Sequence, residues 1–144
     1  MLVKDVLKAK GRRVIWVRPE ATVKEALAQF VEHNIGSLPV VDASGQLVGI
    51  FSERDVLYGL HGDCERFHQR QIHEVMTPNP ITCCPTDGVH DVMGKISQHR
   101  VGQLPVVDGG QLVGVVSVGD LIKSMYERVE AENQHLFAYL YGSP

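Results

Sequence analysis

The chain has 144 residues, which is enough for a compact folded unit with its own core. Its hydrophobic content of 44%, charged content of 22% and net charge of −3 are ordinary for a soluble globular protein. The acidic balance and the lack of a long basic run argue against nucleic-acid binding. No apolar stretch is long enough to span a membrane, and the first residues lack the apolar core of a signal peptide. We therefore expect a cytoplasmic protein with no nucleic-acid or membrane partner.

The chain contains an internal repeat. Residues 35–57 read IGSLPVVDASGQLVGIFSERDVL, and residues 101–122 read VGQLPVVDGGQLVGVVSVGDLI. Pro39 and Pro105 lie 66 positions apart, whereas Asp55 and Asp120, after one deleted loop residue, lie 65 apart. A repeat of this kind determines the architecture, so the two copies are best read together. We expect a first copy over residues 1–62, a linker over 63–71 and a second copy over 72–144.

In the first copy, the pattern predicts a short strand, a helix, a hairpin and a second helix. The strand covers Val14–Val17, and Thr22 is expected to cap a helix that carries Val23, Leu27, Phe30 and Val31 at helical spacing. Two apolar runs around Asp42–Gly45 indicate a hairpin, in which Gly45 takes the left-handed position of the loop. The next helix should begin at Ser52. The segment from Gly59 to Gln71 is polar and predicts a linker.

The second copy predicts the same elements in the same order. A strand over Pro80–Cys83 precedes a helix that we expect Thr86 to cap, with an apolar face formed by Val89, Val92, Met93 and Ile96. Gly109 and Gly110 suit a two-residue hairpin turn. The last helix, from Ser117, is long, and its apolar stripe consists of Leu121, Ile122, Met125, Val129, Leu136 and Leu140. This stripe must cover either its own sheet or a partner subunit, and the sequence leaves both open.

Cysteine and histidine residues offer little sign of redox or metal chemistry. The three cysteines (Cys64, Cys83 and Cys84) are odd in number, which favours free thiols in a reducing compartment. His61, Cys64, His68 and His73 are zinc-binding types, but their spacing matches no established zinc pattern. We therefore predict no metal site, and the role of this cluster and of the adjacent cysteines stays open.

The two Ser-x-x-Asp steps, Ser52–Asp55 and Ser117–Asp120, are the main candidates for chemistry. Such a step at a strand-to-helix junction is close to a capping box, and this structural role alone explains it. The carboxylate of an acidic residue at this place can also accept hydrogen bonds from both hydroxyls of a ribose, while the helix N-terminus beside it favours the binding of phosphate. One serine can serve both roles.

The order G-x-L-P-V-V-D, L-V-G, S-x-x-D resembles the CBS domain, and two copies in tandem resemble a Bateman module, as in small stand-alone bacterial CBS-pair proteins. The resemblance implies an α+β fold of two β-α-β-β-α units packed with pseudo-twofold symmetry, with a long C-terminal helix. It also implies a regulatory module that binds an adenosine ligand in clefts between the repeats and reports to an unidentified effector protein. AMP is favoured, while ADP, ATP, NAD and S-adenosylmethionine stay open.

By the same resemblance, Ser52, Asp55, Ser117 and Asp120 bind ribose. The residues that would contact the base and form the pocket walls are Ile15, Ile35, Gly36, Ser37, Pro39, Thr77, Ile81, Val101, Gly102, Gln103 and Pro105. Nucleotide-regulated relatives often carry His-Arg before Leu-Pro, but this chain has Gly36-Ser37 and Gly102-Gln103 there. Arg54 is then the expected phosphate contact, and because its counterpart is Gly119, the two sites should be unequal.

The sequence shows no nucleophile elbow, phosphate-binding loop or credible metal set, so we do not expect an enzyme. The alternative to a sensor is an assembly module with vestigial pockets, in which the last helix makes the contacts. A homodimer is expected in either case, since symmetric dimers are common.

Overall fold

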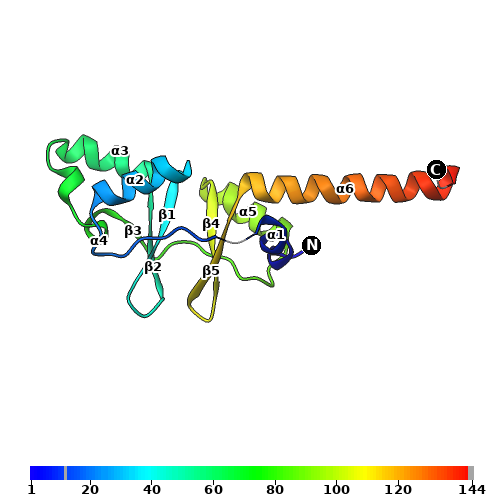
Figure 1. Cartoon of the computed structure of the whole chain (residues 1–144), viewed down its shortest axis with the longest axis horizontal. Helices are drawn as coiled ribbons and strands as arrows, with labels where there is room; N and C mark the ends of the chain where they lie inside the picture. The colour runs from blue at the N-terminus through cyan, green and yellow to red at the C-terminus, as the bar shows by residue number, and fades with distance from the viewer. Residues whose placement is uncertain (12, 143–144) are drawn as a thin grey trace. The chain divides into compact units, whose positions relative to one another are not determined.

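The computed structural model describes residues 1–11 and 13–142, and it contains both helices and sheets (Figure 1). In chain order the elements are α1 (Val3–Lys10), α2 (Val23–His33), β1 (Ser37–Val41), β2 (Leu47–Ser52), α3 (Glu53–Asp63), a 3₁₀ helix η1 (Phe67–Gln69), α4 (Ile72–Val75), β3 (Thr77–Pro78), α5 (Val89–His99), β4 (Gln103–Asp108), β5 (Gln111–Ser117) and α6 (Val118–Tyr141). The mixed fold class, the repeated helix–hairpin–helix order and the long last helix confirm the prediction.

The chain forms two compact units, whose boundaries do not follow the repeats. One unit consists of Met1–Arg12, Pro85–Leu104 and Val115–Pro144, and the other of Arg13–Cys84 and Pro105–Gly114. The N-terminal helix α1 therefore belongs with α5 and α6 of the second repeat. The residues up to Cys84, which open the second repeat, belong with the first.

Two helices that the sequence analysis did not predict account for this exchange. The backbone amides of Val3 and Lys4 in α1 donate to the carbonyls of Asp87 and Pro85, each at 2.9 Å. In the same way, Ile72 and His73 in α4 donate to Ala21 at 2.8 Å and Pro19 at 3.0 Å. These acceptors match at the repeat offset of 66, so α1 and α4 are corresponding helices, and each docks on the other repeat.

Helix starts follow the predicted capping pattern, with one exception. Thr22, Ser52 and Ser117 are N-caps whose side chains each accept from the third residue of the helix. Thr86 was the wrong residue, since α5 begins at Val89 and its N-cap is Gly88. Gly88 matches Thr22 at the repeat offset and pairs with Leu2, which keeps this part of the backbone extended. Thr22 forms the corresponding bridge with Gln71, so α2 and α5 begin at equivalent positions of the repeat, Val23 and Val89.

The hairpins also form as predicted, but the strands expected before them do not. Gly109, Gly110 and Gly45 adopt positive φ angles of 60°, 82° and 87° in the two turns. Within β1 and β2, which are antiparallel, Ser37 lies opposite Ser52, and β3 extends this sheet beside β2. The predicted strands Val14–Val17 and Pro80–Cys83 shrink to single parallel bridges, from Val17 to Val40 and from Cys83 to Val106.

Three phenylalanines form the centre of the core in the unit that holds the first repeat. The ring of Phe51 lies 5.7 Å from that of Phe30 and 6.5 Å from that of Phe67. Phe67 is only 1% exposed, so the segment predicted as a polar linker is in part a core element. The lack of a side chain at Gly59 in α3 makes room for its ring, because a Cβ atom there would overlap Phe67.

We predict that Phe67→Ala lowers the free energy of unfolding by about 3–5 kcal/mol, the range expected when a buried aromatic ring leaves a cavity. Urea denaturation would measure it. The matched control is Phe137→Ala, since Phe137 is 61% exposed on α6. Equal, small effects of the two substitutions would mean that the segment 63–71 is a linker after all.

Candidate functional site

The Asp55 carboxylate is the centre of the first candidate site. One oxygen, Oδ2, accepts from the backbone amide of Ser52 at 2.8 Å and from its hydroxyl at 3.1 Å. The other, Oδ1, accepts from the hydroxyl of Thr77 at 2.9 Å. Thr77 comes from the start of the second repeat, on β3. The structure therefore brings two predicted site residues from different repeats to one carboxylate. Within residues 1–11 and 13–142, the three groups that donate to it are uncharged.

The loop before β1 lies beside this carboxylate. The backbone amide of Glu53, the first residue of α3, donates to the carbonyl of Gly36 at 3.0 Å. Gly36 is exposed, and Ile15, Ile35 and Ile81 are half-buried in the same compact unit. Partly buried aliphatic side chains can pack against a flat ring, and exposed backbone groups can form hydrogen bonds with its edge.

In the other unit, the second repeat builds a matching arrangement. The amide of Val118 donates to the carbonyl of Gly102 at 3.0 Å, as Glu53 does to Gly36. Ser117 caps α6, and its own amide donates to Asp120 Oδ2 at 3.0 Å. Val101 and Gln103 flank the exposed Gly102 and are half-buried.

Asp120 differs from Asp55 in having a cationic partner. Lys10 Nζ lies 2.7 Å from Asp120 Oδ2, and it also donates to the backbone carbonyl of Val115 at 2.9 Å. Burial raises the pKa of the Asp120 carboxyl, but the hydrogen bonds from Lys10 and Ser117 outweigh this, so the pKa lies below its ordinary value of 3.8. The carboxylate is therefore held in its charged form.

The remaining predicted residues are spread over surface and interior. Arg54 is exposed in the first turn of α3. Pro39 and Pro105 are buried, and their carbonyls accept from Val17 and Cys83, each at 3.0 Å. These two prolines therefore anchor the segments that precede each repeat's first long helix.

The sequence did not predict that Thr77 and Lys10 are the partners of the two carboxylates. Lys10 was not considered, and Thr77 was expected at a base rather than beside Asp55. A signal was present, since an apolar pair three residues apart opens each copy, as Val3 and Val6 and again as Ile72 and Val75. The patterns repeat, but only the fold shows that each pair docks on the opposite repeat.

The cysteine and histidine residues do not gather into a metal site. Among residues 1–11 and 13–142, no group of three or more His, Cys, Asp or Glu side chains is placed to hold a metal ion. All three cysteines are free thiols, and Cys83 is buried while Cys84 is exposed, the alternation expected of adjacent residues in extended backbone. No helix in the described residues is long and apolar enough to cross a membrane.

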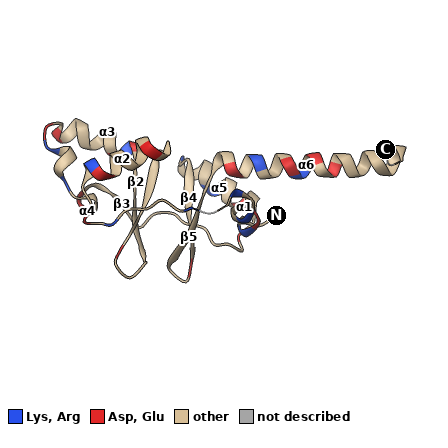
Figure 2. Ribbon diagram, viewed as in Figure 1, with Lys and Arg blue, Asp and Glu red and all other residues tan. Residues whose placement is uncertain are grey.

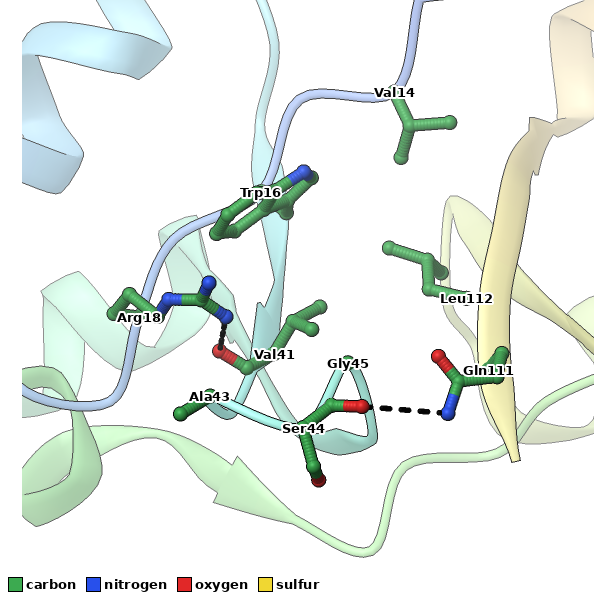
Figure 3. A pocket seen from close by; sticks show the side chains of 9 residues that line it. All are labelled: Val14, Trp16, Arg18, Val41, Ala43, Ser44, Gly45, Gln111 and Leu112. Atoms are coloured by element: carbon green, nitrogen blue, oxygen red, sulfur yellow. Dashed lines mark hydrogen bonds between the residues drawn. The ribbon is translucent and has the colours of Figure 1, made fainter.

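A hollow of about 380 Å³ lies at another place in the unit that holds the first repeat (Figure 3). Its floor includes Trp16, which is 42% exposed, and the guanidinium of Arg18, which stacks 4.6 Å from the centre of the indole ring. Arg18 also donates to the carbonyls of Val41 and Asp42. None of the lining residues is among those predicted to bind the ligand, and the arginine is already engaged with backbone.

The far part of α6 is exposed. Leu121 is buried, but beyond it the helix runs past α1 and α5 of its own unit (Figure 1). Large apolar side chains there are more than half exposed; they are Tyr126, Val129, Leu136, Phe137, Tyr139, Leu140 and Tyr141. After Glu132 the helix carries no Lys, Arg, Asp or Glu (Figure 2). Beyond Met125, the apolar stripe of α6 is thus largely exposed to solvent.

The comparison with protein families decides what kind of protein has this geometry. The family model described as the CBS domain matches residues 3–62 and again 72–127. The chain belongs to the CBS-domain family. It is 34% identical to the CBS domain-containing protein YhcV of Bacillus subtilis over 119 residues, which cover 83% of this chain and 81% of YhcV. The CBS matches end before the exposed, uncharged end of α6.

Two similar CBS structures contain adenosine compounds. The CBS domain pair of protein MJ0100, in complex with 5'-methylthioadenosine and S-adenosyl-L-methionine, has a TM-score of 0.76 and 31% identity, covering 89% of this chain and 98% of that one. CBSX2 in complex with AMP also has a TM-score of 0.76, with 26% identity over 88% of this chain and 96% of that one. CBS pairs of this fold thus accept adenosine-containing ligands.

The Lys10–Asp120 pair predicts a pH dependence. Because the folded-state pKa of Asp120 is depressed, its charge stabilises the fold above the unfolded pKa of about 3.9, and this contribution is lost as pH falls through the folded value. Asp120→Asn should therefore destabilise the protein by a constant amount at neutral pH, and the difference should shrink below about pH 4. Urea denaturation from pH 7 to pH 3 measures it; a difference as large at pH 3 as at pH 7 would contradict the assignment.

Proposed function

We propose that this protein is a non-catalytic regulatory module that binds an adenosine nucleotide and passes the signal to an effector protein. The observation that carries the proposal is the Asp55 carboxylate at the N-terminus of α3, with Thr77 as its hydroxyl partner. Support comes from the adenosine compounds bound to CBSX2 and to the MJ0100 pair. The three free cysteines agree with a reducing compartment, and we place the protein in the cytoplasm.

Ribose is the part of the ligand that we assign to Asp55. A cis-diol offers two uncharged O–H donors to a carboxylate, and the Thr77 hydroxyl already occupies Oδ1 as a donor of the same kind. Exchange of Thr77 for a ribose hydroxyl therefore replaces one neutral hydrogen bond with another. The carboxylate keeps its bonds to Ser52 throughout.

We assign the base to the aliphatic side chains of Ile15, Ile35 and Ile81, with Gly36 and Ser37 offering backbone groups. Phosphate is assigned to the exposed Arg54 and the N-terminus of α3, where the helix dipole favours an anion. One arginine suits a single phosphate better than a triphosphate. AMP is therefore our first choice over ADP, ATP, NAD and S-adenosylmethionine.

Signalling would follow from a population shift. A ligand that binds one arrangement of the chain better than another favours it by the difference in binding free energy, and such couplings typically amount to about 1–3 kcal/mol. Asp55 is the third residue of α3, so a ligand there acts directly on the start of a helix.

Calorimetric titration with AMP and adenosine tests these assignments. Asp55→Ala should weaken both ligands by roughly 10- to 150-fold, since a hydrogen bond to a charged group contributes about 1.5–3 kcal/mol. Arg54→Ala should weaken AMP but spare adenosine. The matched control is Asp91→Ala, because Asp91 holds the same third position in α5.

Equal affinity in wild type and Asp55→Ala would remove the ribose assignment. Equal loss of AMP and adenosine in Arg54→Ala would show that Arg54 does not contact phosphate. A preliminary thermal-unfolding panel with AMP, ADP, ATP, NAD and S-adenosylmethionine selects the ligand, since a ligand concentration of 100 times Kd adds about 2.7 kcal/mol of stability.

The exposed face of α6 favours a second function, assembly, and we propose a homodimer as its product. Ile122, Val129 and Leu136 recur every seven residues and are all more than half exposed. A seven-residue apolar repeat is typical of a helix that packs along another helix. In this view α6 serves assembly, and Asp55 serves sensing.

The pair of substitutions Val129→Glu and Leu136→Glu should convert the dimer to a monomer without changing AMP affinity, because charges in the seam cannot be buried. Light scattering after size-exclusion chromatography measures the mass. As a control, Val31→Glu places the same charge at an 82% exposed apolar residue of α2. A protein that stays dimeric with both glutamates in α6 would contradict this assembly surface.

A further inference from the structure

The two carboxylates that the repeat makes equivalent have different partners. At Asp55, the side-chain donor from the other repeat is the hydroxyl of Thr77; at Asp120, it is the ammonium of Lys10. The remaining contacts match, because Ser52 and Ser117 each donate a backbone amide to their own aspartate. Besides the difference between Arg54 and Gly119, the two sites thus differ in the side chain that the other repeat brings to the aspartate.

Lys10 and Thr77 come from the same region of each repeat but are not equivalent positions, since the docking residues Val3 and Ile72 lie 69 positions apart and Thr77 therefore matches Lys8. Lys10 is the last residue of α1, and Thr77 follows α4 by two residues. These are the two helices that dock on matching carbonyls of the opposite repeat. The same docking that brings a neutral hydroxyl to Asp55 therefore brings a cation to Asp120.

Lys10 is fixed in this position by its surroundings. Val3 and Val6 bury α1 in its unit, with exposed fractions of 0% and 2%. The ammonium makes a second hydrogen bond, to the carbonyl of Val115, and the Asp120 side chain is only 23% exposed. An ion pair with this support differs from an isolated surface pair between two flexible side chains.

The two carboxylates should therefore respond differently to a ribose. At Asp55 a diol exchanges with a neutral hydroxyl. At Asp120 it would have to displace an ammonium whose charge-assisted bond is about twice as strong as a neutral one, and it would leave a partly buried carboxylate without its cation.

We propose that Lys10 occupies the ribose position at Asp120 and closes that site to nucleosides, so that each chain binds one adenosine ligand, at Asp55. This inference rests on the proposed function, from which it takes the ligand class. In this proposal the Lys10 ammonium blocks the ribose position at Asp120. The difference in ligand binding between the two sites then depends on a residue outside the Ser-x-x-Asp steps.

Calorimetric titration with AMP tests the proposal through the number of molecules bound per chain. Wild type should bind one, and Lys10→Thr, which gives Asp120 a hydroxyl partner like that of Asp55, should bind two. Asp55→Ala, with its site weakened by roughly 10- to 150-fold, should show no binding at AMP concentrations that just saturate wild type, and the double variant Lys10→Thr/Asp55→Ala should regain one site there. Lys8→Thr is the control, an exposed lysine on the same helix, and should bind one.

The proposal is overturned if wild type binds two AMP molecules, or if Lys10→Thr still binds one while its thermal unfolding shows it to be folded. Lys10→Met, which removes the ammonium but keeps an apolar stem, provides a second folded variant for that comparison. A wild type with two sites that loses one in Lys10→Thr would make Lys10 a phosphate contact. If neither wild type nor Lys10→Thr binds AMP or another adenosine ligand, the proposed function fails as well. This result differs from failure of the Lys10 proposal alone, in which AMP still binds.

Discussion

The docking of α1 and α4 on opposite repeats is the constraint on which both candidate sites depend. A few backbone hydrogen bonds carry it: Val3 and Lys4 donate to the second repeat, and Ile72 and His73 donate to the first. Each of these helices lies near the start of its copy. Its docking therefore brings Lys10 or Thr77 to the aspartate of the opposite copy. Neither repeat alone contains a complete set of contacts around its aspartate.

The two repeats place their aspartates in similar backbone surroundings but give them different partners. The backbone geometry at Asp55 and Asp120 is nearly the same, since a capping serine and the carbonyl of Gly36 or Gly102 hold each helix start. The side chain brought from the other repeat differs, as do Arg54 and Gly119 in the first turn of each helix. In a tandem repeat, a substitution in or beside the docking helix can therefore change the partner of a carboxylate without any change to the Ser-x-x-Asp step itself.

Local signals in the sequence predicted most of the fold. Thr22, Ser52 and Ser117 cap helices because each hydroxyl accepts a hydrogen bond from the amide three residues later. Gly109 and Gly110 form a tight hairpin turn because both adopt positive φ angles. Errors arose where distant contacts decide the outcome. The cap of α5 is Gly88, which pairs with the distant Leu2, and not Thr86. Phe67 is buried because it reaches Phe51 from a segment of polar composition. The repeat itself predicted that Asp55 and Asp120 are equivalent positions. It could not predict their partners, since nothing adjacent to Lys10 or Thr77 in the chain indicates which carboxylate each one meets.

A crystal structure of the protein grown with AMP would test the central claim most directly, because the claim concerns which atoms the ribose contacts. The account predicts both ribose hydroxyls within hydrogen-bonding distance of the Asp55 carboxylate, the Thr77 hydroxyl displaced or shared, and Lys10 still on Asp120. AMP seated on Asp120 with Lys10 moved away, or held in the hollow beside Trp16 with Asp55 unoccupied, would contradict it.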